Sequence, residues 1–173
     1  HVRTGSLAAA EAQLREVLER DPRRAGAWNL LIAVYGRQGR WAAAREAHGR
    51  ASRHVPGDAS VEAMGRSLAR AREIAASPAP DPIAAAVRDA RVQRELGAPE
   101  AARRILDAAR EVAPDEPRLI LERARTDVAD ARFDLAREVL ERARDADPMR
   151  RDRWQTALRR LAEAEAEAAA RRR

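Results

Sequence analysis

The stretch that decides the fold is AWNLLIAVYGRQGRWAAA, residues 27–44. Trp28, Leu31 and Tyr35 are separated by three and four residues, so they lie on one face of a helix. Gly39 then marks a turn, and a run of alanines follows it. The stretch therefore predicts two helices joined by a short turn, with large side chains on the first and small ones on the second.

The spacing of the prolines shows that this pair of helices is repeated. Pro22 and Pro56 are 34 residues apart, and so are Pro114 and Pro148. Proline has no backbone N–H and restricts the residue before it, so each of these positions ends a helix. A constant period of 34 residues indicates a stack of helical hairpins.

This pattern resembles the tetratricopeptide repeat family, either a bacterial-type repeat protein or the repeat domain of a larger one. In the unit that begins at Ala25, Trp28, Leu31 and Tyr35 occupy positions 4, 7 and 11. The second helix of that unit and the helix-ending proline follow the same pattern, with Ala44, His48, Ala51 and Pro56.

Two later units, 83–116 and 117–150, match well in their second helices and less well in their first. Asp89 and Arg123 stand where the opening unit has Leu31, and Gln93 and Asp127 replace Tyr35. Asp89 and Arg123 occupy equivalent positions of adjacent units, so they either pair or are solvated separately.

The expected fold is all-α, a right-handed superhelical stack of antiparallel hairpins (an α-solenoid) interrupted by a long helix and a proline-rich linker. The N-terminal block, 1–76, holds a half repeat at 1–24, a full repeat at 25–58 and an extra helix at 59–76. The linker is SPAPDP, residues 77–82. The C-terminal block, 83–173, holds the two later repeats and a capping helix at 151–173. The predicted helices lie near 6–20, 25–38, 41–54, 59–76, 83–96, 99–112, 117–129, 132–145 and 150–170.

Composition excludes several classes of function. Cysteine is absent, so neither a disulfide framework nor a thiolate metal site is expected. Aromatic residues are only 3% of the chain. No glycine-rich phosphate loop or nucleophile motif occurs, and His48 takes a packing position. We therefore expect no enzymatic activity, no cofactor, no metal and no membrane span. The compartment stays open between cytoplasm and periplasm.

The net charge of +6 is concentrated in one stretch. Between Arg23 and Arg53 there are seven arginines and a single acid, Glu46. The residues expected to form a basic patch are Arg37, Arg40, Arg45 and Arg53. Such a patch either meets an acidic or anionic surface or is simply a solvated face.

The resemblance also implies a ligand groove. In this family, position 9 of the first helix commonly points into the concave surface, and here that position is Arg91, Arg125 and Arg159. Arg94 and Arg118 are expected on the same surface. Guanidinium groups bind carboxylates through two hydrogen bonds, so an acidic segment or a chain terminus is the favoured ligand. Another 34-residue ladder, Arg45, Arg103 and Arg137, is interpreted as an accident of the arginine-rich composition.

Three functions remain open. The first is a scaffold that binds a peptide or protein partner in the concave groove, with an acidic partner as the favoured one. The second is an accessory or assembly domain of a larger enzyme or secretion complex. The third is a binder of nucleic acid or anionic lipid through residues 23–53, which the small number of aromatic side chains disfavours. Leu7, Leu14 and Val17 on the first helix are expected to pack on the neighbouring hairpin, on another copy or on a longer chain.

Overall fold

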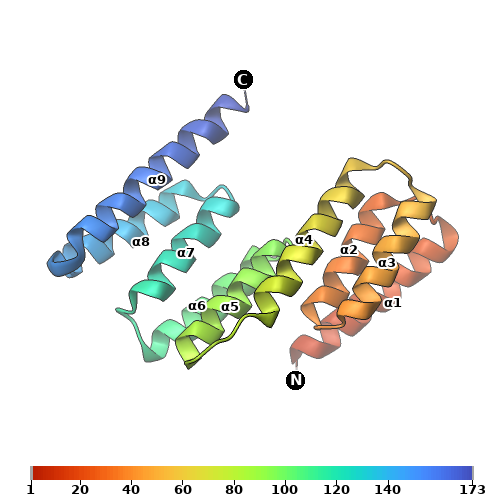
Figure 1. Cartoon of the computed structure of the whole chain (residues 1–173), viewed down its shortest axis with the longest axis horizontal. Coiled ribbons are helices and arrows are strands. Elements are labelled where there is room, and N and C mark those ends of the chain that lie inside the picture. Colours follow the sequence, from red (N-terminus) through yellow and green to blue (C-terminus); the bar gives the residue numbers. More distant parts are fainter. Residues whose placement is uncertain (1, 173) are drawn as a thin grey trace. The chain divides into compact units, whose positions relative to one another are not determined.

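A computed structural model describes residues 2–172 of the chain, with side chains from Ser6 onward. In this range the chain forms nine α-helices and no strand, which confirms the all-α prediction (Figure 1). The helices are α1 (Val2–Arg20), α2 (Ala25–Arg37), α3 (Trp41–His54), α4 (Ala59–Ala76), α5 (Pro82–Glu95), α6 (Pro99–Val112), α7 (Pro117–Ala129), α8 (Phe133–Ala146) and α9 (Arg151–Ala170). A short 3₁₀ turn, Pro148–Arg150, precedes α9.

The helix ends follow from local chemistry. The Asp58 carboxylate accepts hydrogen bonds from the backbone N–H groups of Ser60 and Val61 and so caps α4. The turn after α2 contains Gly39 and the turn after α5 contains Gly97, both with positive φ. The equivalent turn after α7 contains Ala131, which adopts φ 56° without the freedom of glycine.

The chain divides into two compact units, each of which is described by itself. The first contains the residues up to Ser77 together with Glu95–Gly97. The second contains Pro78–Arg94 and the residues from Ala98 onward. The sequence-based block and repeat boundaries stay predictions.

The first unit is built around α2, which packs against α1, α3 and α4. Trp28 is buried, and its Nε1 donates a hydrogen bond to the carbonyl oxygen of Pro22 at 2.8 Å. Ala44 and Ala51 on α3 are fully buried, and their small side chains allow α3 to pack closely against α2. His48 is half-buried on α3, and a Cβ placed on Gly65 of α4 would lie 2.4 Å from its Nε2 atom.

The second unit has two apolar clusters. One joins α5, α6 and α7 through Val87, Leu106 and Leu119. The other joins α7, α8 and α9 around Trp154, which is almost fully buried. The two apolar clusters therefore both include α7, so each hairpin packs against the next, as in stacked repeats.

Buried charges supplement these clusters between α6 and α7. Arg103 of α6 is only 3% exposed, and its Nη1 donates to the Asp127 carboxylate of α7 at 3.1 Å. Arg103 also donates to Glu100 and to Asp130. Hydrogen bonding to Glu100 is the main reason that the pKa of Arg103 is raised, and so the pKa of Glu100 is lowered.

Two sequence-based interpretations are corrected here. Arg123 pairs with Asp107 and Asp127, whereas Asp89 contacts Arg88, so the alternative in which Asp89 pairs with Arg123 is wrong. The arginine ladder interpreted as accidental, Arg45, Arg103 and Arg137, includes two residues that join one hairpin to the helix that follows it. These are Arg103, described above, and Arg137 of α8, which pairs with Glu165 of α9.

Candidate binding groove

A groove with a volume of about 650 Å³ lies between α7 and α9 in the second unit. Each wall is one face of a helix. The α7 wall consists of Leu121, Ala124, Arg125 and Val128, and the α9 wall consists of Arg153, Thr156, Ala157 and Arg160. Both sets have the spacing i, i+3, i+4 and i+7, which places four side chains on one helical face. Leu140 and Leu161 are buried and form part of the floor.

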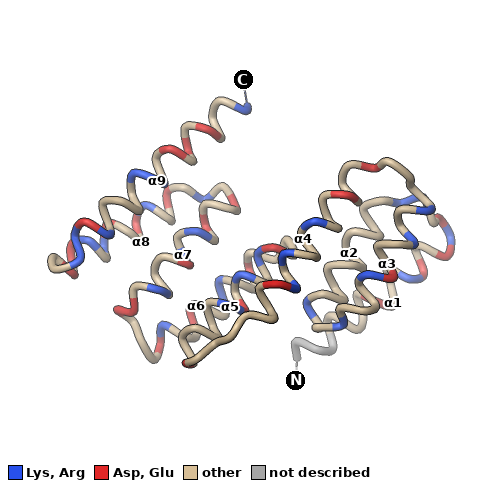
Figure 2. The backbone as a smooth tube through the Cα atoms, viewed as in Figure 1, with Lys and Arg blue, Asp and Glu red and all other residues tan. Residues whose placement is uncertain are grey.

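The two walls differ in character. The α7 wall is apolar except for Arg125, while the α9 wall carries an arginine at each end. With Arg94 of α5 the groove contains four arginines, against one acid, Asp152. The second half of α9 carries acidic bands, and none of its carboxylates is among the lining residues (Figure 2). The groove is thus an apolar trough with a basic rim.

Each space between successive first helices is called a step here, so the groove is the step between α7 and α9. The preceding step, between α5 and α7, is occupied by the carboxylate of an acidic residue. Glu122 of α7 is fully buried. Its Oε2 accepts a hydrogen bond from Arg91 Nε at 2.9 Å, and its Oε1 accepts one from Arg94. Arg125, one turn along α7, approaches Oε2 only at 3.5 Å and is half-exposed. One carboxylate therefore stands among three guanidinium groups.

The structure brings three of the five predicted groove arginines together, and separates the other two. Arg91, Arg94 and Arg125 converge on Glu122, and the latter two line the groove. Arg118 lies at the start of α7, outside the groove lining. Arg159 is exposed on α9 and contacts Thr156 Oγ1 at 3.2 Å.

Arg118 is held by two carboxylates of its own. Its Nη1 donates to Asp81 at 3.0 Å and its Nε donates to Glu116 at 3.0 Å. A backbone hydrogen bond from Ala84, followed by the one from Arg118, lowers the pKa of Asp81. The Arg118 side chain is the main cause of the lowered pKa of Glu116. The role of this cluster is to join the starts of α5 and α7.

Sequence reasoning missed Arg153, Arg160 and Glu122. Position 9 of a first helix faces the next first helix along the stack, as Arg91 faces α7. Arg159, at the same position of α9, is not among the residues that line the groove. The groove side of α9 is instead the side that carries positions 3 and 10, Arg153 and Arg160. For Glu122 the available signal was an acid between the apolar positions Ile120 and Ala124 on α7, both of which are buried.

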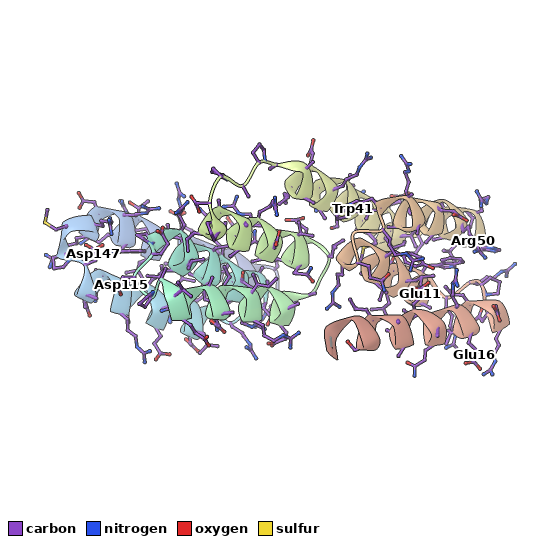
Figure 3. The ribbon with its side chains drawn as sticks, turned by 90° about the horizontal axis from the view of Figure 1, so that it is seen from below. Glu11, Glu16, Trp41, Arg50, Asp115 and Asp147 are labelled. Carbon is purple, nitrogen blue, oxygen red and sulfur yellow. The ribbon has the colours of Figure 1, made fainter. Side chains whose placement is uncertain are left out.

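The four residues of the expected basic patch have different environments. Arg40 pairs with Glu11 of α1 at 2.6 Å and lies over the Tyr35 ring. In Figure 3, Glu11 lies on the side of α1 that faces the other helices, whereas Glu16 projects away from them. Arg45 and Arg53 are exposed on α3, and Arg37 is half-buried at the end of α2. Trp28 and Tyr35 are buried, so their rings are not available to stack on bases.

In the described part of the chain, no cluster of three or more His, Asp or Glu side chains has an arrangement suited to a metal ion. None of the helices described is both long and apolar enough to span a membrane.

Residues 93–161 match the family model described as tetratricopeptide repeat. No curated protein and no solved structure matches the chain. The matched segment includes most of α6 to α9 and both walls of the groove.

Proposed function

Because residues 93–161 belong to the tetratricopeptide repeat family, we propose that the chain is a scaffold that binds a segment of a partner protein in the α7–α9 groove. Tetratricopeptide repeats generally mediate protein–protein interactions. The observation that supports this site is the combination of an apolar floor and a rim of arginines. Fold alone would not locate the site, because one fold serves many functions.

The volume and the lining of the groove support its use as a binding surface. Its volume lies within the range of pockets that hold small ligands or short peptide stretches. Leu121 and Val128 are only partly buried, so an apolar ligand would remove further apolar surface from water. Convergent polar groups at the rim would fix the orientation of the ligand.

Photo-crosslinking tests this proposal directly. A photoreactive phenylalanine analogue replaces Ala157 on the groove wall, and in a control chain it replaces Arg104, which is exposed on α6. After irradiation in lysate of the source cell, discrete crosslinked products are expected from position 157 and not from position 104. Identical products from both positions would contradict the proposal, because contact would then be independent of the groove.

A further inference from the structure

The α7–α9 groove repeats the step between α5 and α7 with one important exchange. Residues 34 apart are equivalent in the two steps, so Arg125 corresponds to Arg91 and Thr156 corresponds to Glu122. In the first step Arg91 donates to the Glu122 carboxylate at 2.9 Å. In the second step the equivalent position, Thr156, supplies only a neutral hydroxyl. The chain's own first step therefore shows which chemical group the second step lacks.

Three of the arginines that line the groove have few acidic partners. Arg125 is 53% exposed and reaches Glu122 only at 3.5 Å. Arg153 and Arg160 make no ion pair with any carboxylate that the structure describes. Asp152 is the one acid among the lining residues. Several like charges in a partly enclosed apolar trough attract an anion more strongly than the same charges spread over an open surface.

We propose that the α7–α9 groove binds a carboxylate from an acidic segment of a partner protein, in the place equivalent to that of Glu122 between α5 and α7. This inference rests on the proposed function. Arg125 donates to the carboxylate from one wall, and Arg153 and Arg160 donate from the other. Apolar side chains next to the acid cover Leu121, Val128 and Ala157. The ligand is thus a stretch in which Asp or Glu adjoins aliphatic or aromatic residues.

The exchange between the two steps provides a matched pair of variants. Thr156→Glu places a carboxylate of the chain's own at the equivalent position, where the Thr156 hydroxyl accepts a hydrogen bond from Arg159. We expect this carboxylate to fill the site from within. Thr156→Gln adds a side chain of nearly the same size without the charge. Because Thr156 is only half-buried, we expect the groove wall to accommodate both side chains.

The probe is a displayed library of random 12-residue peptides, selected on the whole 173-residue chain. Selected sequences are expected to be enriched in Asp or Glu next to Leu, Ile, Val or Phe. One such peptide is then synthesised with a fluorescent label, and its affinity is measured by polarisation. Thr156→Glu is expected to weaken binding at least about tenfold, and Thr156→Gln to weaken it no more than about twofold to threefold.

Charge removal at the rim gives an independent readout. Arg153→Ser combined with Arg160→Ser is expected to weaken binding about tenfold and to reduce its dependence on salt. The matched control combines Arg66→Ser with Arg104→Ser, which removes two exposed charges outside the groove and should leave the affinity unchanged. Circular dichroism confirms that each variant remains helical.

The outcomes separate this inference from the proposed function. Selected peptides that crosslink to position 157 but show no enrichment in acids would overturn the carboxylate assignment and leave the scaffold function standing. Equal losses from Thr156→Glu and Thr156→Gln would also overturn it, because bulk rather than charge would then explain the effect. A selection that yields no peptide dependent on the groove would overturn both.

Discussion

Arg103 and Asp127 form an ion pair that is buried on both sides, with 3.1 Å between Arg103 Nη1 and Asp127 Oδ1. They lie on adjacent helices, α6 and α7, and Asp127 stands where the opening repeat has the apolar ring of Tyr35. Desolvation of the two charges is costly, so such a pair contributes modestly to stability compared with apolar residues that pack well. Breaking it from one side is a different matter, because a buried charge then loses a partner.

Arg103→Ala is therefore expected to lower the free energy of unfolding by about 3 kcal/mol, because Asp127 keeps only Arg123. Arg104→Ala, a change at an exposed neighbour, should alter it by no more than about 0.5 kcal/mol. Urea unfolding followed by circular dichroism measures both. The double variant Arg103→Met with Asp127→Leu should be less destabilised than either single variant; additive losses would show that the two residues are not coupled.

Gly65 and His48 predict a change of sign between two backgrounds. A helical Gly→Ala substitution normally stabilises by about 1 kcal/mol. A Cβ at position 65 would lie 2.4 Å from His48 Nε2, a buried atom, so Gly65→Ala should instead destabilise the chain by about 1 kcal/mol.

In a His48→Ala background the same Gly65→Ala change should stabilise by about 1 kcal/mol. Gly49→Ala on α3 is the control, because nothing lies within 4 Å of the added Cβ, and it should stabilise in both backgrounds. Denaturant midpoints give the comparison. If Gly65→Ala has the same effect with and without His48, the close approach of α3 and α4 is not as described.

Ala131 is expected to be a site of stored strain. Its φ of 56° lies in the left-handed region, which the equivalent turn residue Gly97 adopts without a Cβ penalty. Ala131→Gly should stabilise the chain by about 1 kcal/mol, measured by thermal or urea unfolding. Ala108→Gly in the exposed interior of α6 should do the opposite by about the same amount. Destabilisation by Ala131→Gly would contradict the turn geometry.

Acid should weaken the cluster around Arg118. The folded chain holds the pKa values of Asp81 and Glu116 below their ordinary values of 3.8 and 4.5. A lowered folded pKa means that the stabilisation is present above the unfolded pKa and is lost as the pH falls through the folded one. The urea midpoint should therefore fall between about pH 5 and pH 3, and the fall should be smaller in Arg118→Gln. An unchanged fall in that variant, equal to that of Arg104→Gln, would mean that other carboxylates carry the acid response.

The helices could be predicted from the sequence because their signals are local. Proline spacing and the helix face marked by Trp28 and Tyr35 set the repeat frame. The bounds predicted in that frame for α3, α4, α6 and α7 equal the observed ones. The predicted start of α1 at residue 6 was too late, since the helix begins at Val2. The first proline of the chain is Pro22, so no proline marks where this helix starts.

The site was harder to predict because it depends on which sides of two helices face each other. A repeat frame assigns equivalent positions, and Arg91 and Arg125, which occupy equivalent positions, both contact Glu122. It does not show that a groove between two first helices is lined by different repeat positions on the two helices, because each helix contributes the face directed toward the other. Arg159 was selected because its repeat position is equivalent to that of Arg125, whereas Arg153 and Arg160 line the groove because they lie on the face of α9 that borders it.

The links made by Arg103 and Arg137 bear on how such a chain could be cut and recombined. Each arginine lies on the second helix of one unit and meets a carboxylate on the first helix of the next, Asp127 or Glu165. A 34-residue hairpin transplanted into another array would therefore carry a guanidinium without its acid, or an acid without its guanidinium. The exchangeable module of this chain is the second helix of one hairpin together with the first helix of its neighbour. Recombinant chains joined within the hairpins should therefore be more stable to unfolding than those joined at the proline boundaries.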